Sequence, residues 1–328
     1  MTKRVLVIQT AFLGDAILCT GLLEKIHHEL PEYTLDLLVR KGNEGIFNGH
    51  PFLNNLLIWD KKKQKYKNLF LLWKEIRKQR YDLLINLQRF AASGLLTAIS
   101  GATITLGFDK NPFSFLFSRT VKHDFSIHEA YRNQKLIFGL ASEKHFKPKI
   151  YPQKSNFEKT SAYKVQPYIT IAPASVWFTK QLPAEKWVEL LTFYPGCLVY
   201  FVGSKTDAEL AETIITLCVK QQVELKAVNL CGKLDILDTA SLYADAVMNF
   251  TNDSGPMHIA SAVNAPVRAV FCSTVEKFGF GPLSDNGAII ETTENLKCRP
   301  CGIHGKNSCP EGHFRCAYGI KFNPDKMV

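Results

Sequence analysis

The sequence predicts an α/β protein made of two Rossmann-like, doubly wound parallel-sheet domains. Short apolar runs typical of buried strands alternate with segments whose apolar residues recur at helical spacing, and this alternation indicates βαβ units. A polar stretch over residues 151–167, with a proline near each end, interrupts the alternation, which then begins again. We therefore predict a first domain over residues 1–158, a linker over 159–167 and a second domain over 168–328.

The individual elements follow from the same patterns. Strands of a parallel sheet are covered on both faces, so they read as continuous apolar runs. In the first half we expect strands at residues 4–9, 35–39 and 83–87, with helices at 15–30 and 69–79. In the second half we expect strands at 168–172, 198–202, up to Phe250 and at 267–271, helices at 183–191, 207–218 and from Pro256, and further elements at 227–231 and 240–244.

Two such domains place a cleft between the carboxyl ends of their sheets. The composition is that of an ordinary globular protein, with 46% hydrophobic and 11% aromatic residues. No apolar stretch approaches the roughly 20 residues needed to span a bilayer. The start of the chain reads as a strand, not as a signal peptide, so we expect a cytoplasmic protein.

The excess of positive over negative charge is confined to the first half of the chain. Residues 1–150 contain 23 Lys and Arg against 13 Asp and Glu, whereas residues 151–328 contain 17 of each kind. This asymmetry indicates an anionic partner for the first half, although simple solubility explains it as well. The densest basic run, KKKQKYK at residues 61–67, is equally compatible with a solvated face.

The most informative segment is NDSGPMHIASAV, residues 252–263, which follows an apolar run. Asp253 and Ser254 are typical helix caps, Gly255 permits close approach of the backbone, and Pro256 suits a first helical position. A helix that begins after a parallel strand points N–H groups and its positive dipole end at a ligand, typically a phosphate. The segment therefore predicts a nucleotide or nucleotide-sugar site, with Ser254 and Gly255 as donors to the anion.

Two neighbouring side chains fit this site in different ways. His258 lies in the first helical turn, where side chains lean back toward the N-terminus, so it either reaches the same phosphate or serves as a structural hydrogen bonder. The carboxylate of Asp253 would repel a diphosphate. We expect Asp253 to fix the loop through hydrogen bonds or to hold a sugar hydroxyl.

A second polar loop follows the first strand of the second domain. The segment APASVWFTKQLPAEKW, residues 172–187, carries Ser175, Thr179 and Lys180. A lysine in this loop can neutralise a leaving diphosphate without a metal ion. The alternative is a solvated surface lysine, which is the common case for a single lysine.

The first strand of the chain leads into a loop with Thr10 and Gly14, and then into Asp15 at a helix start. Asp15 is either a helix N-cap or a general base that accepts a proton from an acceptor hydroxyl. The dinucleotide fingerprint G-x-G-x-x-G is absent from this turn, which argues against a nicotinamide-dependent dehydrogenase.

With these features together, the chain resembles the ADP-heptose:lipopolysaccharide heptosyltransferases of glycosyltransferase family 9, in particular the heptosyltransferase II type. The similarity runs over nearly the whole chain, through LGDAILCTGLL, APAS…TKQLPAEKW, FVGSKTDAE, NLCGKLDILDTASLYADAV and NDSGPMHIASAVNAPV. It implies a two-domain GT-B fold and an inverting transfer of heptose from ADP-heptose to the lipopolysaccharide inner core.

The resemblance also implies roles for individual residues. Asp15 is the expected catalytic base, and Thr10 and Gly14 lie on the acceptor side. Lys180 stabilises the leaving group. The donor-side residues are Ser175, Thr179, Lys180, Asp253, Ser254, Gly255, Pro256 and His258. No cofactor is required, since no acidic pair calls for a divalent cation.

The acceptor implied by the resemblance is an acidic glycolipid, lipid A–Kdo or the inner core. A basic first domain suits such an acceptor, and we expect peripheral contact with the inner face of the inner membrane through charge. Nucleic acid is suggested only by the charge, without a recognition helix or interleaved aromatic and basic residues. We therefore expect no nucleic-acid partner.

The cysteines fall into two groups. Cys19, Cys197, Cys218, Cys231 and Cys272 lie in or beside apolar stretches and are expected to be packing residues. The tail, residues 298–316, holds Cys298, Cys301, Cys309 and Cys316, with His304 and His313 between them. Its C-x2-C pair indicates a candidate structural zinc site, although the last two cysteines lack the usual spacing. Free thiols, or a disulfide formed in air, are the alternatives.

Two further functions are compatible with the sequence. One is a GT-B transferase that uses another nucleotide sugar or another acceptor. The other is a catalytically inactive protein that binds a nucleotide sugar, against which the presence of Asp15 argues.

Overall fold

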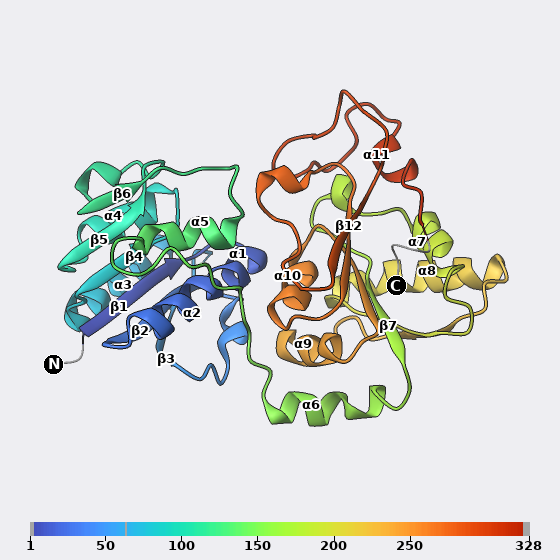
Figure 1. The fold of residues 1–328 in the computed structure, drawn as a ribbon, viewed down its shortest axis with the longest axis horizontal. Coiled ribbons are helices and arrows are strands. Elements are labelled where there is room, and N and C mark those ends of the chain that lie inside the picture. Colours follow the sequence, from blue (N-terminus) through green and yellow to red (C-terminus); the bar gives the residue numbers. More distant parts are fainter. Residues whose placement is uncertain (1–2, 63, 324–328) are drawn as a thin grey trace. The chain divides into compact units, whose positions relative to one another are not determined.

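The computed structural model of the chain describes residues 3–62 and 64–323 and consists of two compact units, Met1–Tyr151 and Pro152–Val328 (Figure 1). Each unit contains one six-stranded sheet in which all neighbouring strands are parallel. Helices cover both faces of each sheet (Figure 1). The prediction of two doubly wound α/β domains is confirmed.

The first sheet has the strand order β3-β2-β1-β4-β5-β6. Its strands are β1 (Lys3–Gln9), β2 (Tyr33–Arg40), β3 (Leu53–Trp59), β4 (Leu83–Asn86), β5 (Ile104–Phe108) and β6 (Arg119–Val121). Its helices are α1 (Leu13–Leu18), α2 (Thr20–Glu29), α3 (Lys65–Gln79), α4 (Ala91–Ala98) and α5 (Glu129–Gln134). Short 3-10 turns lie at Glu44–Phe47, Ser114–Leu116 and Lys135–Ile137.

Apolar side chains close the first sheet on both faces. Leu6, Ile8 and Leu84 pack with Leu72 of α3 and Leu96 of α4 in one buried cluster, while α2 and α5 contact each other on the opposite face. These interlocking layers fix where the loops after each strand emerge.

One fully buried carboxylate, that of Asp36 of β2, lies within this unit. It accepts hydrogen bonds from Arg4 Nη2 at 2.7 Å, Tyr81 Oη at 2.7 Å and Asn54 Nδ2 at 2.8 Å. A buried charge is tolerated when it is paired and hydrogen-bonded, and here the three donors tie β1, β3 and the segment before β4 to β2.

The second sheet has the order β12-β11-β10-β7-β8-β9. Its strands are β7 (Tyr168–Ala172), β8 (Leu198–Phe201), β9 (Lys226–Asn229), β10 (Met248–Asn252), β11 (Val267–Phe271) and β12 (Gly287–Glu291). Its helices are α6 (Lys154–Thr160), α7 (Ala184–Leu191), α8 (Ala208–Lys220), α9 (Ile236–Ala244), α10 (Gly255–Ala262) and α11 (Arg315–Tyr318). Short 3-10 turns lie at Ser161–Tyr163, Phe178–Lys180, Lys205–Asp207 and Glu276–Phe278.

In this second unit α7 and α8 contact each other on one face of the sheet, and α9 and α10 contact each other on the other face (Figure 1). The main core cluster joins the sheet to α7, α8 and the tail, through residues such as Trp187, Ile214 and Phe314. The tail is therefore packed into the second unit.

The predicted domain boundary is wrong by about two helical turns. Residues 154–160, assigned to the first domain and to the linker, form α6, and Asn156 Nδ2 donates to Asp238 of α9 at 2.9 Å. The hydroxyls of Thr160 and Ser241 are 2.9 Å apart. The polar composition of this segment belongs to an exposed helix of the second unit, which begins at Pro152.

The other predicted strands and helices are confirmed, with two kinds of difference. The helix expected over 15–30 is divided at Cys19 into α1 and α2. The sequence analysis missed β3, β5, β6 and β12, α4 and α5, which are short or lie toward the edges of the sheets. Lys63 of the basic run, and the predicted domain ends at residues 1–2 and 324–328, lie outside the described residues.

The strand order creates one switch point in each sheet, where successive crossovers run in opposite directions. It lies between β1 and β4 in the first sheet and between β7 and β10 in the second. In open α/β sheets, ligands bind beyond the carboxyl ends of the strands at this point. The loops after these four strands are therefore where a site is expected.

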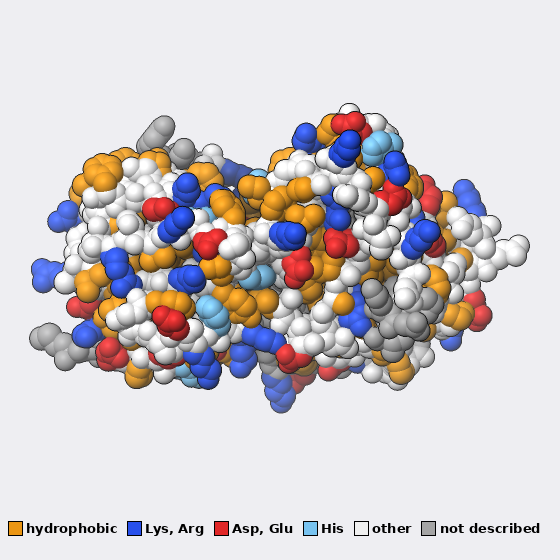
Figure 2. Space-filling view, turned by 45° about the horizontal axis from the view of Figure 1, so that its top comes forward, with side chains coloured by type: hydrophobic (Ala, Val, Ile, Leu, Met, Phe, Trp, Pro, Cys, Tyr) orange, Lys and Arg blue, Asp and Glu red, His pale blue; other side chains and the backbone are white. Residues whose placement is uncertain are grey.

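Within the described part of the chain, no helix is both long and apolar enough to cross a membrane. On the face drawn in Figure 2, Lys and Arg side chains are interspersed with acidic and apolar ones. The basic character of the first half is therefore distributed on this face, not gathered into one continuous patch.

Candidate functional site

The loops after β7 and β10 lie next to each other because Thr251 of β10 pairs with Ala172 of β7. Asn252, which is fully buried, fastens them together: its Nδ2 donates to the carbonyl of Pro173 at 2.8 Å, and its Oδ1 accepts from the N–H of Leu182 at 2.9 Å. Both ends of the loop that carries Lys180 are thus bound to the end of β10.

Lys180 and Asp253 form an ion pair at this edge, with 2.6 Å between Nζ and Oδ2. Their side chains are only 14% and 7% exposed, so the interpretation of Lys180 as a solvated surface residue is wrong. Thr274 Oγ1, in the loop after β11, donates to the same oxygen of Asp253 at 2.6 Å. Asp253 thus fixes the loops through hydrogen bonds, as one of its two predicted roles requires.

Helix α10 begins beside this pair. Ser254 occupies the N-cap in an extended conformation, but its hydroxyl donates to the carbonyl of Asn252 at 3.3 Å and does not cap the helix. The helix starts at Gly255, so Pro256 is its second residue and not, as predicted, its first. His258 lies in the first turn and is 5% exposed. The backbone N–H groups and the dipole of this helix end face the same edge as Lys180.

Two donor-side residues of the β7 loop have different surroundings. Ser175 is half-buried, and its N–H donates to Gln181 Oε1 at 3.2 Å. Thr179 is 1% exposed, and its hydroxyl oxygen accepts hydrogen bonds from the N–H of Lys306 at 2.8 Å and from Ser273 Oγ at 2.9 Å. The expectation that Thr179 contacts the donor does not fit this burial, because its hydroxyl is turned toward the tail.

Asp15 lies in the first turn of α1, shortly after the end of β1, and is half-buried. The N-cap of α1 is Phe12, so the interpretation of Asp15 as an N-cap is wrong. Gly14 lies in the same turn and is half-buried. Asp15 is therefore a residue of the first helical turn and not the N-cap residue.

A buried arginine lies close enough to Asp15 to interact with its charge. Arg132 of α5 is 1% exposed, forms an ion pair with Glu129 and donates to the carbonyl of Asp124 at 3.0 Å. Burial, and next the charge of Arg89, lower the pKa of Arg132 to about 10, while the carboxylates of Asp124 and Asp15 oppose this shift. Arg132 is therefore charged at neutral pH, and Asp15 is one of the carboxylates that interact with this charge.

Arg89 belongs to the same edge because it follows β4. The ring of Phe125 lies between two guanidinium groups, 5.3 Å from that of Arg89 and 5.4 Å from that of Arg132. Burial, and next the charges of Arg132 and Arg89, lower the pKa of His123 to about 4, so His123 is neutral at pH 7. This edge therefore carries two guanidinium groups, of which that of Arg132 is paired with Glu129.

The sequence analysis missed these three residues. Arg89 directly follows the predicted strand at 83–87, and its place at a strand end was a usable signal. Arg132 and His123 lie where no element was predicted, so only the fold brings Arg132 to Asp15 and His123 to Arg132.

Thr10 is 2% exposed and is held by a lysine of the basic run. Lys61 Nζ donates to the carbonyl oxygen of Thr10 at 2.8 Å and lies 2.9 Å from its hydroxyl oxygen. Lys62 and Lys67, in contrast, are exposed. Part of the basic run is therefore structural and part is solvated.

Comparison with known proteins assigns the chain to a family. The model of "Glycosyltransferase family 9 (heptosyltransferase)" matches residues 69–308. This chain belongs to glycosyltransferase family 9. The matched span contains Lys180 and the segment 252–258, and Asp15 precedes it.

Relatives of this family 9 glycosyltransferase cover nearly its whole length. It is 25% identical to lipooligosaccharide heptosyltransferase 2 of Campylobacter jejuni, over 97% of this chain and 94% of that protein. Its fold is similar to a family 9 glycosyltransferase of Veillonella parvula (TM-score 0.80, 22% identity, 88% and 86% of the two chains). It is also similar to the ADP-heptose LPS heptosyltransferase II of E. coli (TM-score 0.74, 20% identity, 91% and 95%). The GT-B fold and glycosyltransferase class implied by the resemblance are confirmed.

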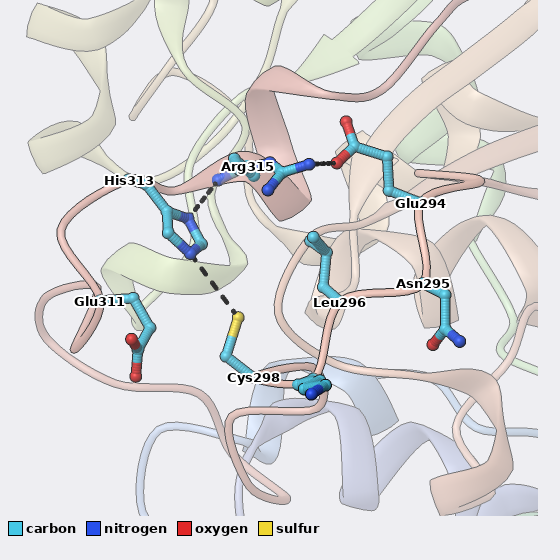
Figure 3. A pocket seen from close by; sticks show the side chains of 8 residues that line it. Glu294, Asn295, Leu296, Cys298, Glu311, His313 and Arg315 are labelled. Atoms are coloured by element: carbon cyan, nitrogen blue, oxygen red, sulfur yellow. Dashed lines mark hydrogen bonds and ion pairs between the residues drawn. The ribbon is translucent and has the colours of Figure 1, made fainter.

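In the cysteine-rich tail of this glycosyltransferase, the described thiols lie near one another but are not arranged around a single metal position. Cys298 Sγ lies 4.0 Å from His313 Nε2, and the N–H of Arg315 donates to His313 Nδ1 at 3.1 Å (Figure 3). Burial, and next the charges of Cys301 and Cys309, raise the pKa of Cys316 to about 12. Over residues 3–62 and 64–323, no three His, Cys, Asp or Glu side chains are grouped to hold a metal ion.

All nine cysteines are free thiols, and the packing interpretation fits those outside the tail. Cys19, Cys218, Cys231 and Cys272 are buried, and Cys197 is half-buried. Burial raises the pKa of the Cys231 thiol to about 12 and that of Cys272 well above its usual value. These thiols stay protonated and unreactive at neutral pH.

Proposed function

We propose that this enzyme transfers heptose from ADP-heptose to the inner core of lipopolysaccharide, with inversion at the anomeric carbon. The observation that carries the proposal is the Lys180–Asp253 pair beside the start of α10, at the switch point of the second sheet, in a chain of family 9. The printed names of the relatives, heptosyltransferases of lipooligosaccharide or lipopolysaccharide, support this choice of substrates.

In the second unit, the proposed donor site stabilises the departing ADP. Negative charge develops on the diphosphate as the bond between the anomeric carbon and its oxygen breaks. The ammonium of Lys180 and the donors of Ser254 and Gly255 would receive that charge, with Ser175, Pro256 and His258 around them. Asp253 orients Lys180 and stays away from the phosphates, because like charges repel.

In the first unit, the proposed acceptor site activates the incoming hydroxyl. Asp15 takes the proton of this hydroxyl. The hydroxyl oxygen of the acceptor forms the new bond to the anomeric carbon, on the side opposite the leaving ADP. The charge of Arg132 interacts with Asp15, and Arg89 supplies positive charge for an acidic acceptor such as lipid A–Kdo or the inner core. Thr10 and Gly14 shape the loop that carries Asp15.

The Asp15→Asn variant tests the base. It should lower the turnover rate by about a thousandfold, since a neutral amide of the same shape accepts no proton. The dissociation constant of ADP should stay within about twofold of wild type, because Asp15 lies outside the donor unit. Both are measured on purified protein, by transfer assay and calorimetry, with the exposed Glu75→Gln as control. Transfer by Asp15→Asn near the wild-type rate would remove Asp15 from this role.

A nucleotide panel tests the donor. ADP and ADP-heptose should raise the melting temperature, since a ligand at about 100 times its dissociation constant adds about 2.7 kcal/mol. UDP and GDP compounds should have little effect, and Lys180→Ala should weaken the response to ADP. Stabilisation by UDP compounds alone would favour a transferase of another nucleotide sugar. Stabilisation by ADP-heptose without any transfer would indicate an inactive binding protein.

We also propose that the enzyme is cytoplasmic and binds the inner face of the inner membrane through α3 and α4. Leu69, Phe70 and Trp73 of α3 and Leu95, Leu96 and Ile99 of α4 line an apolar groove. Phe70 and Leu71 are 50% and 52% exposed. The same helix exposes Lys67, Lys74, Arg77 and Lys78. Exposed apolar side chains beside basic ones are typical of binding to anionic lipid.

Liposome sedimentation tests this surface. The wild-type protein should bind phosphatidylglycerol vesicles and not phosphatidylcholine vesicles, and salt should weaken the binding. The Phe70→Ser/Leu71→Ser variant should bind about tenfold more weakly, because each loses buried apolar area in the bilayer. Val219→Ser in α8, where Val219 is 73% exposed, is the matched control. Equal binding of the wild type and the double variant would refute this surface.

A structural zinc in the tail is a further proposal, carried by the spacing of Cys298 and Cys301 and by the proximity of Cys309 and Cys316. Within the described residues these thiols are not grouped to hold a metal ion, so the experiment decides between a zinc site and free thiols. Elemental analysis of protein purified under reducing conditions should find about one zinc per chain, lost in Cys298→Ser and kept in Cys197→Ser. Metal-free protein with four reactive tail thiols would contradict it.

A further inference from the structure

We propose that residues 299–306, here called the brace, position Lys180 in the donor site, and that Thr179 and Gly305 are the positioning residues through which they act. This inference rests on the proposed role of Lys180 in binding ADP. The brace belongs to the tail, about 120 residues after Lys180 in the chain, yet it contacts the loop of Lys180 directly.

The brace is anchored on the end of β11. The Arg299 guanidinium donates to the carbonyls of Cys272 at 2.7 Å and Thr274 at 2.8 Å, and its side chain is only 10% exposed. The N–H of Cys301 donates to the carbonyl of Ser273 at 2.9 Å. One end of the brace is therefore fixed to the loop whose Thr274 holds Asp253.

The other end of the brace is bound to Thr179. The N–H of Thr179 donates to the carbonyl of Lys306 at 3.0 Å, and the N–H of Lys306 donates back to Thr179 Oγ1 at 2.8 Å. Ser273 also reaches Thr179 twice, through its N–H to the carbonyl at 3.2 Å and through its hydroxyl to Oγ1 at 2.9 Å. Thr179 is thus a buried junction between the brace and the β11 loop, and it directly precedes Lys180.

Gly305 brings the backbone of the brace against the stem of Lys180. Its φ is +78°, and a Cβ there would lie 2.9 Å from Lys180 Cγ, 3.1 Å from Thr179 Oγ1 and 3.2 Å from Trp177 Cβ. Cγ is close to the main chain of Lys180, so a side chain at position 305 displaces the lysine itself. Contact with the brace therefore sets the direction in which the ammonium points.

A pair of glycine substitutions separates this contact from backbone strain. Gly302 lies in the same segment with φ +106°, and a Cβ at this position would meet no described heavy atom within 4 Å. Both Gly302→Ala and Gly305→Ala impose a left-handed alanine and should cost similar strain. Only Gly305→Ala should weaken ADP binding, by about tenfold, with Gly302→Ala within about twofold of wild type.

Steady-state kinetics add a readout that mere destabilisation would not move. Gly305→Ala should raise KM for ADP-heptose and leave KM for the acceptor unchanged, at a temperature where both variants are folded by circular dichroism.

Thr179 supplies a second test. Thr179→Val removes the hydroxyl and should weaken ADP binding about tenfold, whereas Thr179→Ser keeps the hydroxyl and should restore affinity to within about threefold.

The outcomes distinguish this proposal from the proposed function. If Lys180→Ala leaves ADP affinity unchanged, the role of Lys180 in the donor site is wrong. If Lys180→Ala weakens ADP binding but Gly305→Ala behaves like Gly302→Ala, and Thr179→Val like Thr179→Ser, the donor site stands and the brace has no positioning role.

Discussion

The arrangement of the second unit depends on a charged pair that is almost withdrawn from water. Taking Lys180 and Asp253 out of solvent costs several kcal/mol for each ion, and their attraction offsets this only when the geometry is good and the remaining polar atoms are satisfied. Thr274 and the segments that hold Thr179 supply that geometry. The loops after β7, β10 and β11 are consequently placed with respect to one another before any ligand arrives.

The first unit has the same fold but a different arrangement of charged residues at its switch point. Both sheets have their switch point between their first and fourth strands, and in both the loops at this point carry the charged residues. In the second unit, a cation is paired with a carboxylate beside a helix end, which suits a bound anion. In the first unit, the half-buried Asp15 lies near enough to the buried Arg132 for their charges to interact. The same topology thus places a carboxylate near a buried arginine in one unit and a lysine–carboxylate pair beside a helix end in the other.

The sequence predicted those features that depend on local pattern. Central strands such as β1, β7 and β11 were found because burial on both faces makes them uniformly apolar. The turn and helix start at 252–258 were found because glycine, proline and cap-type residues are local signals. Edge strands such as β3 and β12 were missed, since half-exposed strands mix polar and apolar residues. The role of α6 was misjudged because a polar exposed helix and a linker have similar composition.

What the sequence could not reveal was contact between distant segments. Asp15 was found, but Arg132 lies more than a hundred residues later and reaches it only through the packing of α5 on α1. Thr179 was read as a donor contact because it stands beside Lys180, and no local pattern shows that the tail covers it. Neighbours in sequence are thus separated by the fold: Lys180 pairs with Asp253 at the edge of the sheet, whereas Thr179 is buried under the tail.

This separation has a thermodynamic consequence for the tail. If the brace holds Lys180 in the orientation that binds a diphosphate, a bound diphosphate must hold the brace equally, because coupling between two sites is reciprocal. Arg299 and Thr179 join the tail to the β11 and β7 loops, so order in the tail and order in the donor site are a single equilibrium. Cys301 belongs to the brace, and Cys298, Cys309 and Cys316 belong to the parts of the tail outside it. Metal binding or oxidation at these cysteines would therefore change how firmly the ammonium of Lys180 is held in its orientation.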